Sequence, residues 1–485
     1  MMASAILQWA APLLCAGAVA AAVLSAKGKG KLFVWLGLAC VVALSLSSHS
    51  LVLSEWHMPT FGNTMIHVAN AREVLEQGGY PLWADFSYGG LPQGLRNTYV
   101  PAYRMTLAAV GFLFGAPVAQ LFPAYALIGF DQTDAALDLI SRFLVLLFAV
   151  LLPLGFFLLA RRLFGEPAGV FAALFSTLCA ELLIYTVRPL PQAFGLVLLP
   201  FAFVELVRGN KISSVVLALL VAMVHQEAVA FYAAVAFAYA VFLIAFENKS
   251  YWPVASLNVS RQAKIALACW LVASVAYLGW QFYTLGSPNI FELAQFKYHE
   301  GGPATVEIFL AKVGWANALL GFAAIGVAGA WLLAGKIGRR IAQQALAAAF
   351  FVGGLLCAHG IVKQAGFLPQ LAFLFPDAVG SSSTMVVSIS VGGILFGIAC
   401  AVVIFFVSRM LWDVVEKHKE QSGALLFAVS ALCAGFALVK NDVVGINVFM
   451  DRFIVFLALP LVLLAAWFSQ VLVERLLRKN SSVSP

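Results

Sequence analysis

The hydrophobic pattern of the chain is a succession of apolar runs, each about 20 residues long, separated by short polar segments. Helical runs of this length match the thickness of a bilayer, whereas a β-barrel would show short segments of alternating polarity. We therefore expect an all-α polytopic membrane protein, built as a single transmembrane domain over residues 1–485. About 13 spans are expected, at residues 6–26, 32–53, 139–160, 167–187, 193–207, 212–225, 228–246, 264–284, 315–334, 341–362, 384–408, 422–439 and 452–473.

The composition agrees with this pattern. The chain is 62% hydrophobic and only 11% charged, whereas soluble domains carry about 25% charged residues. All seven cysteines lie inside apolar runs and none forms a CxxC pair, so we expect neither disulfides nor cysteine-bound metal. The first run has no charged segment before it and no cleavage site after it, which predicts a retained helix.

A further apolar run, 104–128, decides the topology. Pro117 and Pro123 favour a broken segment that does not cross the membrane. With that arrangement one face of the membrane collects 19 of the 29 Lys and Arg residues but only about seven of the 22 acidic residues. Because basic loops favour the cytoplasm, we predict a multi-pass plasma-membrane protein with its N-terminus outside and its C-terminus in the cytoplasm.

The same topology places two long polar segments on the outer face. The larger is an outer loop over residues 54–138, which carries amphipathic or interfacial helices, and the second outer loop covers residues 286–315. Polar groups are costly to bury in a membrane unless they have partners, so clusters at the outer ends of spans indicate function.

The first outer loop contains a predicted helix over 64–77, closed by a pair of glycines. Asn63, His67 and Asn70 follow the spacing i, i+4, i+7, which places them on one helix face. The opposite face, near Val68, is expected to lie on lipid. An ordinary interfacial helix without a binding role would show the same pattern, so the spacing alone leaves both interpretations open.

Three further positions lie at predicted outer ends of spans. Arg188 ends one span, and His225 and Glu227 lie in a break between two spans, where a simple hydrophilic turn is the alternative. Arg452 opens the last span on the face that basic residues avoid. It therefore needs a carboxylate such as Asp451, or an anionic ligand such as a lipid phosphate.

The first loop also supplies Glu55, Asp85 and Arg72. A carboxylate can take the proton of an acceptor hydroxyl, and His67 can act as a base near neutral pH. Cationic side chains stabilise the charge that develops on a leaving phosphate. Together these residue types suit a lipid-linked phosphorylated substrate at the outer face of the membrane.

The layout resembles the GT-C superfamily of integral-membrane glycosyltransferases, which includes protein mannosyltransferases and the aminoarabinose transferases of lipid A. Several short segments carry the resemblance in the family's order: AREVLEQGGYPLW in the first loop, YVPAYRMTLAAVGFLFG after it, then ARRLFG, AGVFAALFSTLCAELLIYTVRP and RFIVFLALPLVLLAA. The resemblance implies a polyprenyl-phosphate sugar donor and an acidic base on the first loop.

The sequence departs from the family at that acidic position, because Asn63 occupies it. An amide cannot act as a general base, although it can orient an acceptor or bind a metal. The resemblance therefore leaves Glu55, Asp85 or His67 to serve as the base, and Asn63, Asn70, Arg72, Arg188, His225, Glu227 and Arg452 to bind substrate. It also matches Arg452 to a phosphate-binding residue. No motif for transfer of a whole oligosaccharide is present, so transfer of a single sugar is favoured.

The expected function is thus transfer of one sugar from a polyprenyl-phosphate donor to a lipid, glycan or protein acceptor. A divalent metal ion is the one cofactor that the sequence leaves possible. The expected partners include membrane lipid and no nucleic acid. Two alternatives remain. A non-catalytic GT-C-like scaffold or assembly subunit would explain Asn63, and a flippase or transporter of lipid or polysaccharide would show broken helices with ionisable residues near mid-membrane.

Overall fold

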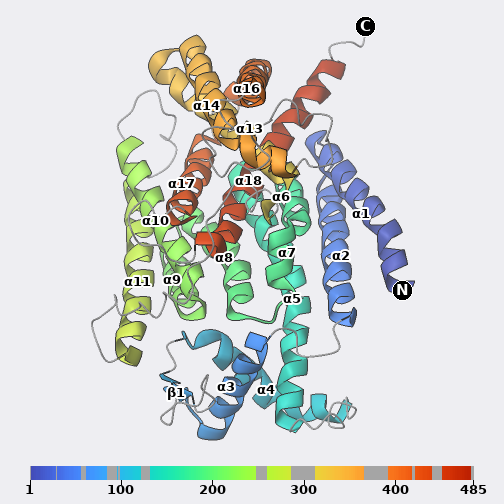
Figure 1. Cartoon of the computed structure of the whole chain (residues 1–485), viewed down its shortest axis with the longest axis vertical. Helices are drawn as coiled ribbons and strands as arrows, with labels where there is room; N and C mark the ends of the chain where they lie inside the picture. The colour runs from blue at the N-terminus through green and yellow to red at the C-terminus, as the bar shows by residue number, and fades with distance from the viewer. Residues whose placement is uncertain are drawn as a thin grey trace.

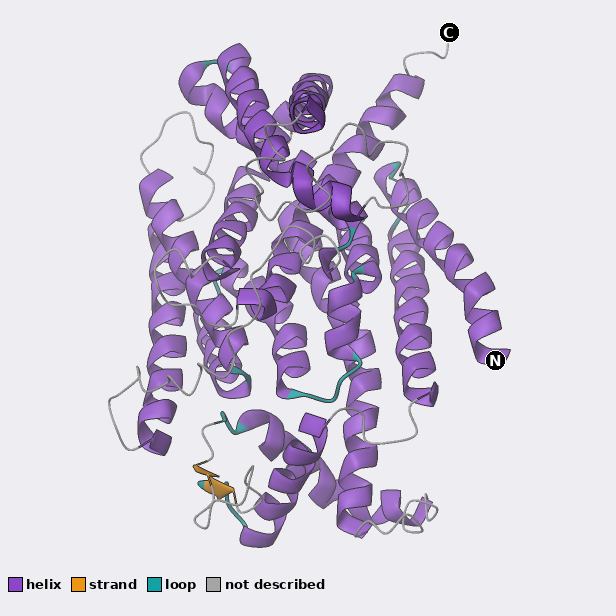
Figure 2. Ribbon diagram, in the orientation of Figure 1, coloured by secondary structure: helices purple, strands orange, loops and turns teal. Residues whose placement is uncertain are grey.

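A computed structural model of the chain describes residues 2–28, 30–55, 62–84, 95–96, 99–121, 132–246, 259–285, 312–364, 391–417, 421–439 and 450–481. Helices dominate these residues, and a pair of two-residue strands lies at the lower end of the molecule (Figure 2). The N-terminal part contains α1 (Met2–Ala26), α2 (Lys31–Glu55), α3 (Gly62–Gln77), β1 (Trp83–Ala84), β2 (Leu95–Arg96), α4 (Ala102–Leu121), α5 (Gln132–Phe164), α6 (Glu166–Leu178) and α7 (Ala180–Thr186).

The remainder of the described chain is entirely helical. It contains α8 (Pro191–Arg208), α9 (Lys211–Val224), α10 (Gln226–Phe246), α11 (Val259–Leu285), α13 (Trp315–Ile337), α14 (Arg339–Gln364), α16 (Val391–Lys417), α17 (Ser422–Val439) and α18 (Met450–Ser481). Local sequence explains both ends of α8. α8 begins with Pro191, which fits the first helical turn, and ends before Gly209, whose φ of 71° is favourable for glycine.

Most helices form one bundle around α18 (Figure 1). Every residue from Phe453 to Val471 is buried, so α18 is packed on all sides along most of its length. A helix that is apolar on all faces is expected in such a central position. At the start of α18, Arg452 reaches Glu227 of α10.

Each of the thirteen expected spans overlaps a helix or, for 167–187, a pair of helices. Among the described residues, seven helices (α2, α5, α8, α10, α11, α16 and α18) are long and apolar enough to cross a membrane. The pair α6 and α7, bent by 69° at Cys179, raises this number to eight if it counts as one span. The protein is therefore a multi-pass α-helical membrane protein, while the full set of thirteen spans stays a prediction.

The chain between α2 and α5 forms a separate layer at one end of the bundle. In Figure 1, α2 ends and α5 begins at the lower end of the molecule, and α3 and α4 lie there against the first turns of α5. A small apolar core holds them together, formed by Val68, Ala71, Val74, Leu107, Ala108, Leu137 and Ile140. The described part of the 54–138 loop is thus folded onto the bundle. Its placement outside the cell stays a prediction.

One expectation for this layer is wrong. Val68 was expected on the lipid-facing side of α3, but it is 1% exposed and packs in the small core. The polar side of α3 is buried as well, because His67 and Asn70 face neighbouring parts of the protein. The helix is therefore covered on both sides by α4 and α5 and does not lie with one free face on lipid.

Candidate functional site

The centre of the lower layer is a contact between α3 and α4. The Arg104 guanidinium donates through Nε to His67 Nδ1 at 3.0 Å and through Nη1 to the Tyr80 hydroxyl at 2.8 Å. Arg104 is only 1% exposed, and its guanidinium carbon lies 4.7 Å from the centre of the Tyr99 ring. A buried guanidinium with these partners is fixed in position, since each lost contact would leave a desolvated charge.

Electrostatics assign a protonation state to His67. Burial lowers the pKa of His67 well below its usual value of about 6.5, and the neighbouring Arg104 and, to a smaller extent, His225 lower it further. The imidazole is therefore neutral at pH 7. Because Nδ1 accepts the hydrogen bond from Arg104, the ring proton resides on Nε2.

Aromatic residues connect this layer to the bundle. The backbone carbonyl of Tyr99 accepts hydrogen bonds from the Tyr80 hydroxyl at 3.0 Å and from Trp280 Nε1 of α11 at 3.1 Å. The Tyr103 hydroxyl of α4 donates to the carbonyl of Pro189, in the turn between α7 and α8, at 2.7 Å. The lower layer is thus attached to the bundle at two separate places, which fixes His67 relative to it.

A second polar group lies at the break between α9 and α10. The backbone N–H of Glu227 donates to His225 Nδ1 at 3.3 Å, and the Gln192 amide of α8 donates to Glu227 Oε2. The other carboxylate oxygen, Oε1, lies 3.5 Å from Nη1 of Arg452 at the start of α18. The Glu227 side chain is fully buried, whereas that of Arg452 is 37% exposed.

Close packing of α8 and α10 holds this group in place. A Cβ atom built on Gly195 would lie 2.8 Å from the Cβ of Ala228 and 3.4 Å from the Cβ of His225. Contacts below 3.0 Å do not occur between real Cβ atoms, so only glycine permits the two helices to approach this closely. The approach brings Gln192 within reach of Glu227.

The two polar groups adjoin. The α4 helix, whose Arg104 holds His67, packs against α9, so the lower layer adjoins the α9–α10 break, and His225 lies within electrostatic reach of His67. Arg188, just after the end of α7, lies in the same region. Its guanidinium carbon is 5.8 Å from the centre of the Tyr185 ring. The structure therefore brings together His67, Arg188, His225, Glu227 and Arg452, which belong to four different segments of the sequence.

Other expected site residues lie elsewhere. Arg72 forms an ion pair with Asp134 of α5 at 2.8 Å and a longer one with Glu76 at 3.6 Å, so it ties α3 to α5. Asn70 is buried and donates within its own helix to the carbonyl of Ile66 at 2.8 Å. Asp85 and the side chains of Glu55, Asn63 and Asp451 lie outside the described residues, so their roles stay predictions.

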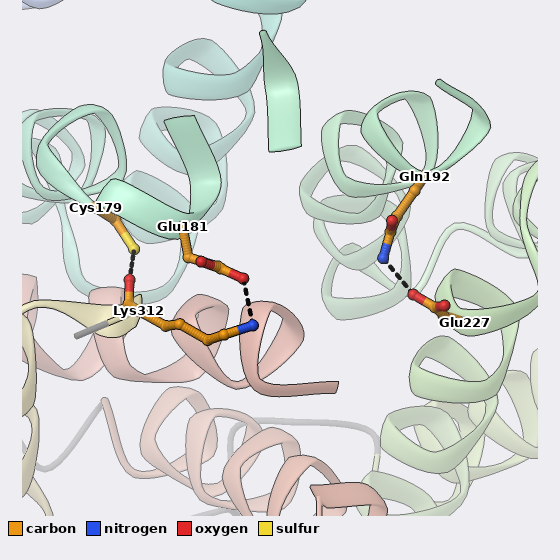
Figure 3. Close-up of polar contacts among 5 residues, drawn as sticks. All are labelled: Cys179, Glu181, Gln192, Glu227 and Lys312. Carbon is orange, nitrogen blue, oxygen red and sulfur yellow. Dashed lines mark hydrogen bonds and ion pairs between the residues drawn. The ribbon is translucent and has the colours of Figure 1, made fainter. Parts of the chain in front are cut away.

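Sequence reasoning missed three charged residues. Arg104 was assigned to an interfacial segment, and Glu181 and Lys312 were not considered. Figure 3 shows that Glu181, in the first turn of α7, pairs with Lys312, with 2.9 Å between Oε1 and Nζ. Arg104 and Glu181 were detectable in principle, because a single charge inside an apolar run requires a partner when the run is buried, whereas Lys312 lies in the predicted second outer loop.

The residue types in this region suit an anionic ligand more than a metal. Among the residues that the structure describes, no three His, Cys, Asp or Glu side chains are grouped so that they could hold a metal ion. The two guanidinium groups and the lysine instead supply several donors close to two carboxylates. No protein-family model matches the chain, and no curated protein matches its sequence.

Proposed function

We propose that this protein is a membrane glycosyltransferase that transfers a single sugar from a polyprenyl-phosphate donor to an acceptor at the outer face of the plasma membrane. The observation that supports this proposal best is the ion pair between Glu227, at the start of α10, and Arg452, at the start of α18. His225, two residues before Glu227, lies within electrostatic reach of His67 in α3. Four residues selected from the sequence for this chemistry therefore lie in one region.

The charges suit a phosphate leaving group. The guanidinium of Arg452 is held on one side by Glu227 and is 37% exposed, so it can present donors to a ligand. Arg188 is near the same place, beside Tyr185. Cationic donors that are fixed before the reaction stabilise developing negative charge without reorganisation. The apolar helices around the region would accommodate a polyprenyl chain.

Neutral His67 fits a role in positioning rather than in charge stabilisation. Its Nδ1 is occupied by Arg104, and its remaining ring N–H is on Nε2. A neutral imidazole can donate one hydrogen bond to a sugar hydroxyl. In this proposal, His67 and His225 orient the sugar, while the cations hold the phosphate.

A second candidate function is supported by a separate observation. The helices α6 and α7 are bent by 69° at Cys179, and the next turn contains the buried carboxylate of Glu181. Broken helices with ionisable residues inside a bundle are typical of transporters. A flippase that moves the lipid-linked sugar across the membrane would use the same ligand chemistry without breaking the glycosidic bond.

One experiment distinguishes the two functions. The protein is reconstituted in vesicles with polyprenyl-phosphate sugars labelled in the sugar, using a panel of hexoses and pentoses, and membrane extracts supply the acceptors. A glycosyltransferase moves label from the lipid donor into a product, and Arg452→Ala removes this activity. A flippase changes the leaflet of the intact donor. Label that stays on the donor for every sugar would refute the proposed transfer.

A further inference from the structure

The break between α6 and α7 places a carboxylate inside the bundle. Cys179 adopts an extended conformation, with φ of −76° and ψ of 110°, and α7 restarts at Ala180. Glu181 in the first turn of α7 is 5% exposed. Burial of an ionised carboxylate is costly without a partner, so its position in this break requires an explanation.

Contacts that do not involve the Glu181 side chain already hold the break against the segment 312–317. The Cys179 thiol donates to the carbonyl of Lys312 at 3.7 Å, and the Asn317 amide of α13 donates to the carbonyl of Phe175 at 3.4 Å. These contacts dock the segment 312–317 onto the break. Because they do not involve the Glu181 side chain, the break can be held without its charge.

The carboxylate of Glu181 faces the region already described. In Figure 3, the Glu181–Lys312 pair and the Gln192–Glu227 pair point toward one another, from α7 on one side and from α8 and α10 on the other. Tyr185, one turn after Glu181 in α7, lies within electrostatic reach of Glu181, Glu227, Arg188 and Arg452. Glu181 therefore belongs to the same group of charges as the proposed phosphate-binding residues.

The two carboxylates differ in what occupies their oxygen atoms. Gln192 and Arg452 take both oxygens of Glu227. For Glu181, the contact that the structure shows within the described residues is through Oε1 to Lys312, whose side chain is 24% exposed. The ammonium group contacts Oε1 and is on a partly exposed side chain, which leaves Oε2 as a site for a proton.

We infer that Glu181 is the general base of the proposed sugar transfer, and that Lys312 positions it. The acceptor hydroxyl gives its proton to Glu181 Oε2 while its oxygen forms the bond to the anomeric carbon. The bond from that carbon to the phosphate oxygen breaks, and its electron pair leaves with the polyprenyl phosphate. This inference rests on the proposed function. It supplies a carboxylate where Asn63 cannot act as a base.

The test uses the full-length protein in vesicles and measures sugar transfer. Glu181→Gln is expected to lower kcat by about 100-fold or more, because a general base contributes 10²–10⁴-fold, with little change in the KM for the donor. The acidic limb of the pH–rate profile should disappear as well. Glu181→Asp should recover part of kcat. The matched control is Glu166→Gln at the start of α6, which should transfer sugar at the wild-type rate.

A double variant separates catalysis from stability. Glu181→Gln combined with Lys312→Gln removes both charges and leaves neither unpaired, so it keeps the fold even if the single variant does not. A purely structural pair would recover activity in the double variant, and that result would overturn the inference. Wild-type kcat in Glu181→Gln would overturn it too. If the wild-type protein itself transfers no sugar, the proposed function fails first, which is a distinguishable result.

Discussion

Ion pairs inside the bundle differ from the ion pair at the turn between α5 and α6. In the interior, Glu227 is fully buried while its partner Arg452 is 37% exposed. At the turn, Arg161 and Glu166 lie 3.3 Å apart, and their side chains are 39% and 33% exposed. An exposed pair is screened by solvent and contributes little to stability, whereas a buried carboxylate depends on its partner.

The Glu181–Lys312 pair repeats the interior arrangement. Its carboxylate is 7% exposed and its ammonium group is on a side chain that is 24% exposed. In both interior pairs the acidic side chain is therefore more deeply buried than the basic one, which is partly exposed. This geometry pairs a buried carboxylate with a cation inside an apolar bundle and presents positive charge to a ligand. The turn between α5 and α6 shows no such asymmetry.

The largest expected effect is that of Arg452→Met. The substitution leaves the buried charge of Glu227 without its guanidinium, and we expect the free energy of unfolding to fall by about 3 kcal/mol, together with loss of sugar transfer. Arg161→Met at the turn is the control and should lower the free energy of unfolding by less than about 1 kcal/mol. Denaturant unfolding in detergent measures both. Equal losses in the two variants would remove the distinction between the regions.

The next effect is a pH dependence caused by His67. Burial, Arg104 and His225 lower its pKa in the folded state, so the unfolded state binds its proton first as the pH falls. Above pH about 6.5, His67 is neutral in both states and its full contribution to the free energy of unfolding is present. Below that pH the free energy of unfolding decreases, by up to about 1.4 kcal/mol per pH unit.

His67→Gln should remove this part of the pH dependence, because the side-chain oxygen of glutamine can still accept from Arg104. The measurement is the difference in unfolding free energy between wild type and variant at pH 7 and at pH 5. The same difference at both values would show that His67 is not held neutral by its surroundings.

A smaller effect is expected for Arg72 and Asp134, which join α3 to α5. Their side chains are 33% and 19% exposed, intermediate between the interior pairs and the turn. A double-mutant cycle with Arg72→Ala and Asp134→Ala should give a coupling free energy of about 0.5–1 kcal/mol. If Arg72→Ala loses sugar transfer without losing stability, Arg72 binds substrate, as expected from the sequence.

The smallest effect is expected for the pair at the turn between α5 and α6. A double-mutant cycle with Arg161→Ala and Glu166→Ala should give less than about 0.5 kcal/mol, and this value should decrease further in high salt. A coupling as large as that of the interior pairs would mean that exposure does not determine the strength of these ion pairs.

The sequence by itself determined where the helices lie and that the protein is a membrane protein. Runs of apolar residues predicted each span region, and the break at His225 was visible because polar residues interrupt an apolar stretch. The helix at 64–77 and its end at Gly78, which has φ of 67°, were predictable from short-range pattern as well. Backbone hydrogen bonding and hydrophobic periodicity are local, so nearby residues suffice to predict them.

Only the tertiary structure decided which charges meet. Glu227 and Arg452 are 225 residues apart, and Glu181 and Lys312 are 131 apart. Periodicity does not specify the rotation of one helix against another, so it could not reveal that Arg104 contacts His67 or that Val68 is buried. Those contacts follow from packing of whole helices, where close approach at positions such as Gly195 determines which side chains face each other.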